Sequence, residues 1–118
     1  AGNYKTPLIY VNVKAMFTNT VPVDAYRGAG RPEATYQIER VIDMAARELG
    51  ADPVALRRQN YVTEFPYATP VAVEYDTGDY HATMDKLEEI GDFTGFEERR
   101  QESEATAKGL GLGINTCI

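Results

Sequence analysis

The most informative stretch of this chain is Ala25-Tyr26-Arg27-Gly28-Ala29-Gly30-Arg31-Pro32-Glu33-Ala34. Its two glycines carry no Cβ atom, so the backbone there can approach a ligand closely. Pro32 suits the first turn of a helix, and the free N–H groups at a helix start favour an anion. These residues predict a loop that builds a binding site. An ordinary strand-to-helix turn with glycines at positive φ remains equally compatible with them.

The segments on both sides of this loop predict a mixed α+β fold, in which helices cover a small sheet. The expected elements are a strand over Leu8–Phe17, helices over Pro32–Leu49 and Pro53–Asn60, at most a short strand within Val71–Tyr75, helices near Tyr80–Ile90 and Gly95–Ala107, and a strand from Lys108. We expect the first and last strands to pair in one sheet. The helix face expected to cover that sheet comprises Ile38, Val41, Ile42, Ala45 and Leu49.

Composition excludes several classes of partner. The net charge is −6, and residues 61–118 hold twelve acidic against four basic side chains. No basic stripe is present for nucleic acid, and the acidic half is most simply a solvated helical surface. No apolar run approaches the roughly 20 residues that span a bilayer, so we expect no membrane segment. A single cysteine excludes an intrachain disulfide, and we expect a cytoplasmic protein.

Few side chains outside the loop are candidates for metal binding or catalysis. Cys117 and His81 cannot make a structural zinc site and could pair only through long-range folding. Glu33 and Glu39 are interpreted as residues of a helix start and a helix surface, and the Arg57-Arg58 pair as a solvated face or a subunit contact. We therefore expect no protein-bound metal in this chain, and we interpret neither glutamate as a catalytic residue.

The loop and its flanks resemble the large, molybdopterin-binding subunit of the molybdenum hydroxylases. This family includes the xanthine dehydrogenase, aldehyde oxidase and aerobic carbon monoxide dehydrogenase relatives. Besides the loop, the resemblance rests on Phe17-Thr18-Asn19-Thr20-Val21-Pro22, Ile38-Glu39-Arg40, Ala45-Ala46-Arg47-Glu48-Leu49-Gly50, Asp52-Pro53, Leu56-Arg57-Arg58-Gln59-Asn60-Tyr61 and Gly109-Leu110-Gly111-Leu112-Gly113. Nearly the whole chain is covered by this ordered series, which implies part of a molybdopterin-binding domain.

The resemblance implies a role for four loop residues. Arg27 aligns with an arginine that contacts the molybdenum cofactor, and Tyr26 and Gly28 place backbone groups near the ligands of the metal. Ala29 stands where xanthine and aldehyde enzymes carry a phenylalanine that stacks on the substrate, which implies a differently shaped pocket. Gly28 stands where carbon monoxide dehydrogenases carry a copper-ligating cysteine. Glycine offers no soft ligand for Cu(I), which argues against carbon monoxide oxidation.

The resemblance also implies the reaction and the partners. The family hydroxylates aldehydes or N-heterocycles with oxygen taken from water, and its glutamate base lies outside the segment matched here. The implied cofactor is molybdopterin, in the cytosine dinucleotide form, and FAD and iron–sulfur clusters are expected on partner subunits of a hetero-oligomer.

The chain has no initiator Met and stops after a glycine-rich apolar run, so we expect residues 1–118 to be an internal fragment of the larger subunit. A mature small domain is the alternative. The rival function is a non-catalytic α+β interaction domain whose acidic helices bind a partner.

Overall fold

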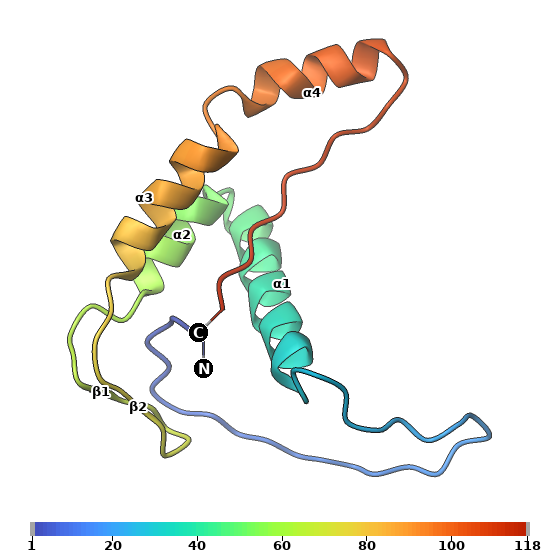
Figure 1. The fold of residues 1–118 in the computed structure, drawn as a ribbon, viewed down its shortest axis with the longest axis vertical. Helices are drawn as coiled ribbons and strands as arrows, with labels where there is room; N and C mark the ends of the chain where they lie inside the picture. Colours follow the sequence, from blue (N-terminus) through green and yellow to red (C-terminus); the bar gives the residue numbers. More distant parts are fainter. Residues whose placement is uncertain (1, 118) are drawn as a thin grey trace.

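The computed structural model describes residues 2–117 and has a mixed α+β architecture, which confirms the predicted fold class. In chain order the elements are α1 (Arg31–Leu49), α2 (Pro53–Asn60), β1 (Tyr67–Ala68), β2 (Glu74–Tyr75), α3 (Tyr80–Gly91) and α4 (Phe96–Ala105). A long arm runs from the first residues to the start of α1, and α4 extends away from the other helices (Figure 1).

The helix boundaries follow local signals in the sequence. The Asp52 carboxylate accepts the Ala55 amide at 2.7 Å and starts α2, and Asp79 accepts the Ala82 amide at 2.9 Å and starts α3. Gly50 adopts φ 61° and closes α1 with its amide on the Ala46 and Arg47 carbonyls. These are the side-chain N-cap and left-handed C-cap arrangements expected of such residues.

The predicted sheet is wrong. Residues 8–17 and 108–114 run as extended chain without strand pairing, and the only ladder in the described residues joins β1 to β2 in an antiparallel hairpin. Its register pairs Tyr67 with Tyr75 and Ala68 with Glu74. A β-strand needs a neighbouring strand that accepts hydrogen bonds from its N–H groups and donates hydrogen bonds to its C=O groups. Residues 2–117 provide no such neighbour for either segment.

A small core joins the first residues to α1, α2 and α3. Tyr4, Val54, Tyr61 and Met84 form its buried centre, and an isolated antiparallel bridge links Tyr4 to Tyr61. The rings of these two tyrosines stack at 5.6 Å. Partly buried side chains around this centre are Ile38, Ile42, Tyr80, Leu87, Phe93 and Ile114.

The buried face of α1 differs from the predicted one. Ile38 and Ile42 pack on the core as expected, but Val41 and Leu49 are 61% and 71% exposed. Ala46 is fully buried instead. The buried stripe is therefore rotated, because the core lies toward α2 and the chain ends rather than against a sheet.

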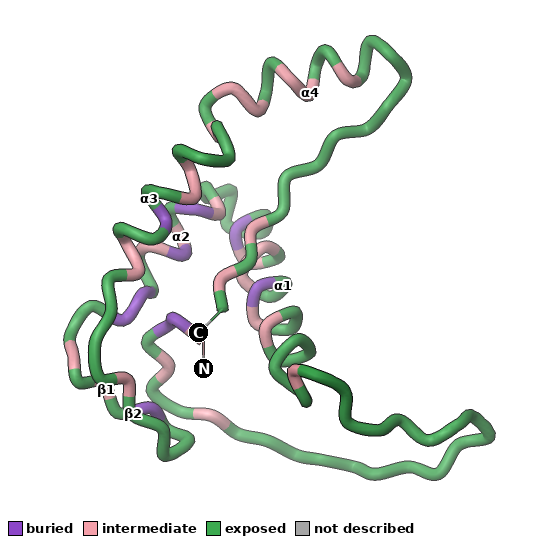
Figure 2. Tube along the Cα trace, in the orientation of Figure 1, coloured by how far each residue is buried: buried purple, intermediate pink, exposed green. Residues whose placement is uncertain are grey.

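The arm carries much of the exposed apolar surface, and residues 10–27 of it are exposed throughout (Figure 2). A patch of this size marks a surface that another element covers. We therefore expect the isolated 118-residue chain to bind a hydrophobic dye and to unfold without a sharp transition. Dye fluorescence and a thermal melt check this, and a cooperative melt of a monomer that binds no dye would contradict it.

Candidate functional site

The predicted cofactor loop forms two successive turns directly before α1. The Ala29 amide donates to the Tyr26 carbonyl at 2.8 Å, and the Arg31 amide donates to the Gly28 carbonyl at 2.9 Å. The Ala34 amide then donates to the Gly30 carbonyl at 3.0 Å and begins the helix. These bonds fix the exit of the loop to the first turn of α1, so the position of the helix determines the position of the loop.

Three consecutive loop residues have left-handed backbone conformations. The φ angles are 105° at Gly28, 37° at Ala29 and 91° at Gly30. A Cβ atom on Gly28 would lie 3.0 Å from both Cγ and Cδ of Pro32, whereas one on Gly30 would meet open space. Position 28 therefore requires glycine for its conformation and for the space beside it.

The loop presents unpaired donors, which suits an anionic ligand. The Tyr26 side chain is 88% exposed and Arg27 is also exposed. Within residues 2–117, Arg27 makes no hydrogen bond or ion pair, and the amides of Arg27, Gly28 and Gly30 donate to no other group. A guanidinium and clustered backbone N–H groups are suited to phosphate-like and oxo ligands. The residues present thus fit a bound anionic cofactor on this loop.

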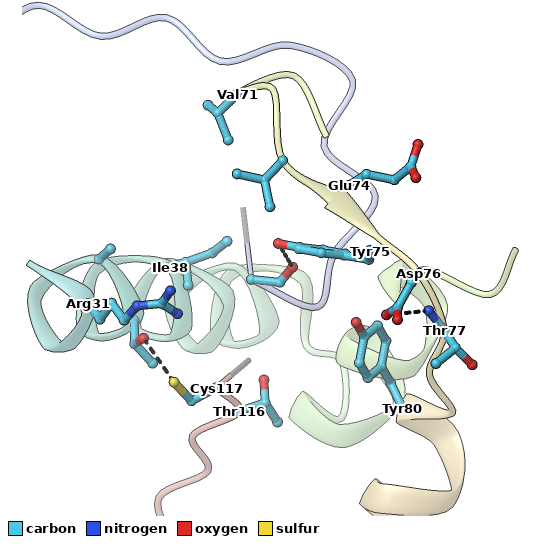
Figure 3. Close-up of a pocket in the computed structure, with 14 residues that line it drawn as sticks. Arg31, Ile38, Val71, Glu74, Tyr75, Asp76, Thr77, Tyr80, Thr116 and Cys117 are labelled. Carbon is cyan, nitrogen blue, oxygen red and sulfur yellow. Dashed lines mark hydrogen bonds between the residues drawn. The ribbon is translucent and has the colours of Figure 1, made fainter. Parts of the chain in front are cut away.

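A cavity of about 490 Å³ begins one residue after the loop (Figure 3). Arg31, Thr35 and Ile38 of α1 line one side, and the β1–β2 hairpin lines another. Its size falls within the roughly 300–1,000 Å³ of small-molecule sites. Tyr75 lies at this cavity and donates its hydroxyl to the Gly2 carbonyl at 3.2 Å. Burial raises the pKa of the Tyr75 hydroxyl above its ordinary value.

A buried ion-pair network holds α1 against α2. Arg57 Nε lies 2.8 Å from a Glu39 carboxylate oxygen, and Arg57 Nη2 lies 2.8 Å from Asp43. The hydroxyls of Tyr4 and Thr116 each donate to the other Glu39 oxygen at 2.7 Å. Glu39 therefore joins residues from both ends of the described chain to α1 and α2.

Burial and hydrogen bonding change the pKa of Arg57 in opposite directions. Burial alone lowers the pKa of Arg57, but hydrogen bonds to Asp43 and Glu39 outweigh it and raise the pKa above its ordinary value. Burial is the main cause of the raised pKa of Tyr4, whose hydroxyl therefore remains a donor to Glu39. Arg57 therefore keeps its positive charge at neutral pH and pairs with the Glu39 and Asp43 carboxylates.

This network corrects two interpretations made from the sequence. Glu39 is 4% exposed rather than a surface residue, and Arg57 is 0% exposed rather than solvated. Arg58 is also engaged, since its guanidinium lies 2.6 Å from Asp85 and contacts Glu88 on α3. Glu39, Asp43 and Ala46 recur at helical spacing on one stripe of α1, which is the signal that could have indicated a buried carboxylate facing a partner.

The other two candidates, His81 and Cys117, are not part of the loop. The His81 ring packs edge-on against Tyr61 at 5.5 Å, and Cys117 lies by Thr35, with Sγ 4.0 Å from the threonine hydroxyl. In the part of the chain that the structure covers, no three His, Cys, Asp or Glu side chains are grouped to hold a metal ion. Among residues 2–117, no helix is both long and apolar enough to cross a lipid bilayer.

Sequence comparison identifies the family to which this loop and its helices belong. Residues 1–61 match the model of the molybdopterin cofactor-binding domain. That span is just over half of the chain and holds the Tyr26–Gly30 loop, α1 and α2. The chain therefore belongs to the molybdopterin-binding oxidoreductase family, which confirms the resemblance seen in its motifs.

Particular relatives agree with this assignment. The chain is 35% identical to the nicotine 6-hydroxylase large subunit of Paenarthrobacter nicotinovorans, over 99% of its own length. It is also 35% identical to the carbon monoxide dehydrogenase large chain of Hydrogenophaga pseudoflava, over 95% of its length. The solved carbon monoxide dehydrogenase of Oligotropha carboxidovorans superposes with a TM-score of 0.55 and 37% identity over 71% of this chain.

The chain spans only a small part of these proteins. It covers 14% of the nicotine 6-hydroxylase subunit, 15% of the carbon monoxide dehydrogenase chain and 10% of the solved structure. The similarity therefore assigns the chain to one segment of a molybdopterin-binding domain.

Proposed function

We propose that residues 1–118 form part of the molybdenum-cofactor site of a larger hydroxylase, which oxidises an aldehyde or an N-heterocycle with oxygen from water. The observation that carries this proposal is the Tyr26–Gly30 loop. Its arginine and three of its amides have no hydrogen-bond partner among residues 2–117, and it lies within the residues that match a molybdopterin cofactor-binding domain.

Each loop residue has a proposed role. Arg27 binds an anionic group of the cofactor through its guanidinium, and the backbone of Tyr26 and Gly28 faces the ligands of the metal. Ala29 borders the substrate and leaves more room than an aromatic side chain would. When bound, the molybdenum cofactor supplies the redox chemistry, while this chain binds and orients it. No residue here acts as the general base, which we place elsewhere in the subunit.

Position 28 argues against carbon monoxide as the proposed substrate. Carbon monoxide dehydrogenase is among the relatives, but Gly28 has no sulfur with which to hold Cu(I). Its φ of 105° and the proximity of Pro32 also disfavour any side chain there. Relatives described as a nicotine 6-hydroxylase and an aldehyde oxidoreductase support the assignment to N-heterocycle or aldehyde oxidation.

The proposed assembly contains further subunits. Two of the matched relatives are described as a large subunit and a large chain, and a third as subunit gamma of a dehydrogenase complex. We propose partner subunits that carry FAD and iron–sulfur clusters, and a cofactor in the cytosine dinucleotide form. Nucleotide analysis of the released cofactor and the absorption spectrum of the purified complex check both proposals.

Arg27→Ala in the full-length enzyme tests the site. Losing a hydrogen bond to a charged group costs about 1.5–3 kcal/mol, so molybdenum content or turnover should fall about tenfold or more. Arg27→Lys should not restore it, because an ammonium lacks the planar fork of donors. Metal analysis of the purified protein and steady-state turnover are the measurements.

Arg40→Ala provides the matched control, because Arg40 is an exposed arginine of α1 away from the loop. It should leave molybdenum content and turnover unchanged. If Arg27→Ala behaved like Arg40→Ala, the loop would be a plain turn. An unchanged Arg27→Ala variant together with a specific protein partner for the acidic helices would favour the interaction-domain alternative.

A further inference from the structure

The first part of the arm has the sequence pattern of a strand but pairs with no other segment of residues 2–117. Residues 8–17 read Leu-Ile-Tyr-Val-Asn-Val-Lys-Ala-Met-Phe, and apolar side chains occupy every odd position. Val11, Val13 and Phe17 on that odd face are 69%, 83% and 108% exposed. The even face holds Asn12 and Lys14 at its centre. One apolar and one partly polar face is the pattern of a half-buried strand.

The backbone of this segment is also unpaired. The last hydrogen bonds before it are those of Lys5 with the Asn60 carbonyl and of Thr6 with the Tyr67 hydroxyl, at 2.8 and 3.2 Å. From residue 7 to residue 17, no backbone group bonds to any described residue. Both edges of a potential strand are therefore open, and open edges pair with other chain segments.

We propose that residues 8–17 are a docking edge on which the remainder of the same polypeptide adds β-strands, burying the odd face of the segment. This inference rests on the proposed function, since it requires a larger subunit. The occupant is identified by two observations. The segment lies inside residues 1–61 that match the cofactor-binding domain, and the chain spans only 14% of the nicotine 6-hydroxylase large subunit.

Pairing with a second copy of this chain is a poorer solution. Two copies of residues 8–17 would give an isolated two-stranded ribbon, which is marginal in water. A sheet contributed by the remaining polypeptide supplies neighbours on both edges and an apolar layer for the odd face. Main-chain bonds then provide affinity, and the alternating side chains fix the register.

Hydrogen exchange of the full-length large subunit, purified as a monomer without other subunits, tests the proposal. The amides of residues 8–17 should exchange at least about a hundredfold more slowly than in the urea-unfolded protein. Exchange at the unfolded rate in the monomer would overturn it. Protection that arises only in a dimer, or only after partner subunits are added, would overturn it too, because each assigns a different occupant.

Two neighbouring substitutions separate the two faces. Val13→Asp places a charge on the odd face, and Asn12→Asp places the same charge on the even face. Val13→Asp should remove the protection of residues 8–17, and Asn12→Asp should retain it. If Val13→Asp prevents folding, Val13→Thr keeps the shape of the side chain and should reduce the protection at least about fivefold. Equal protection in the odd-face and even-face variants would contradict the proposed register.

The readout is independent of the cofactor. Exchange protection requires neither molybdenum nor turnover, so it can be measured in the cofactor-free subunit. Protected residues 8–17 in a protein whose Arg27→Ala variant keeps its molybdenum would leave the docking edge in place and remove only the cofactor site. If residues 8–17 are unprotected in an enzyme that loses molybdenum in the Arg27→Ala variant, the cofactor site stands and the docking edge is removed.

Discussion

Arg57→Ala should destabilise the protein by about 3–5 kcal/mol, because it leaves the buried Glu39 carboxylate without its counter-charge. Glu39 is 4% exposed and would retain only the hydroxyls of Tyr4 and Thr116 as partners of one oxygen. Asp43 would lose its ion pair as well. The midpoint of urea unfolding of the full-length subunit, compared with that of the unmodified protein, measures this loss.

Arg58→Ala is the matched control, because it removes the same side chain one residue away. Its ion pairs with Asp85 and Glu88 are partly exposed to solvent, and exposed pairs contribute about 1 kcal/mol or less. The urea midpoint should therefore move much less than in Arg57→Ala. Equal shifts for the two arginines would show that the buried network does not hold α1 and α2 together.

Gly28→Cys should damage the cofactor site rather than convert it to carbon monoxide chemistry. A side chain at φ 105° costs about 1–3 kcal/mol, and its Cβ would lie 3.0 Å from two Pro32 carbons. Since 1.4 kcal/mol corresponds to a factor of ten, molybdenum content should fall about fivefold or more. We expect no carbon monoxide oxidation when copper is supplied. Metal analysis and an assay with carbon monoxide measure the two outcomes.

Ala29→Cys controls for the added thiol, since position 29 already carries a Cβ at φ 37°. This variant should keep its molybdenum, because it adds only a sulfur atom to a conformation that the loop already accepts. Full molybdenum content and new carbon monoxide oxidation in Gly28→Cys would show that position 28 tolerates a side chain and can hold copper.

Local features of the fold were predictable because their causes are local. The Asp52 and Asp79 caps, the Gly50 end of α1 and the apolar spacing of Ile38 and Ile42 act within a few residues of the helices that they define. The observed α1 begins at Arg31, one residue before the predicted start. The loop sequence also predicted where the glycines would adopt positive φ, although both a binding loop and a plain turn require that conformation.

Long-range features were not predictable from the same signals. The alternation of residues 8–17 indicates a strand-forming sequence, but pairing depends on a neighbour that the described residues do not supply. The burial of Arg57 depends on Glu39, which lies 18 residues earlier on another helix. Arg57 and Arg58 are adjacent and chemically identical, so the local sequence does not indicate which of them faces the interior. Family membership, rather than periodicity, supports a cofactor on the loop.

The position of the metal in the holoenzyme decides whether the Tyr26–Gly30 loop forms part of the cofactor site. Crystals of the full-length holoenzyme, measured on both sides of the molybdenum absorption edge, would locate the atom by its anomalous signal. We expect a peak adjacent to the Tyr26–Ala29 backbone, with the Arg27 guanidinium hydrogen-bonded to the cofactor and no other side chain between the loop and the metal. A molybdenum peak separated from this loop by other residues, with Arg27 still free of the cofactor, would contradict it.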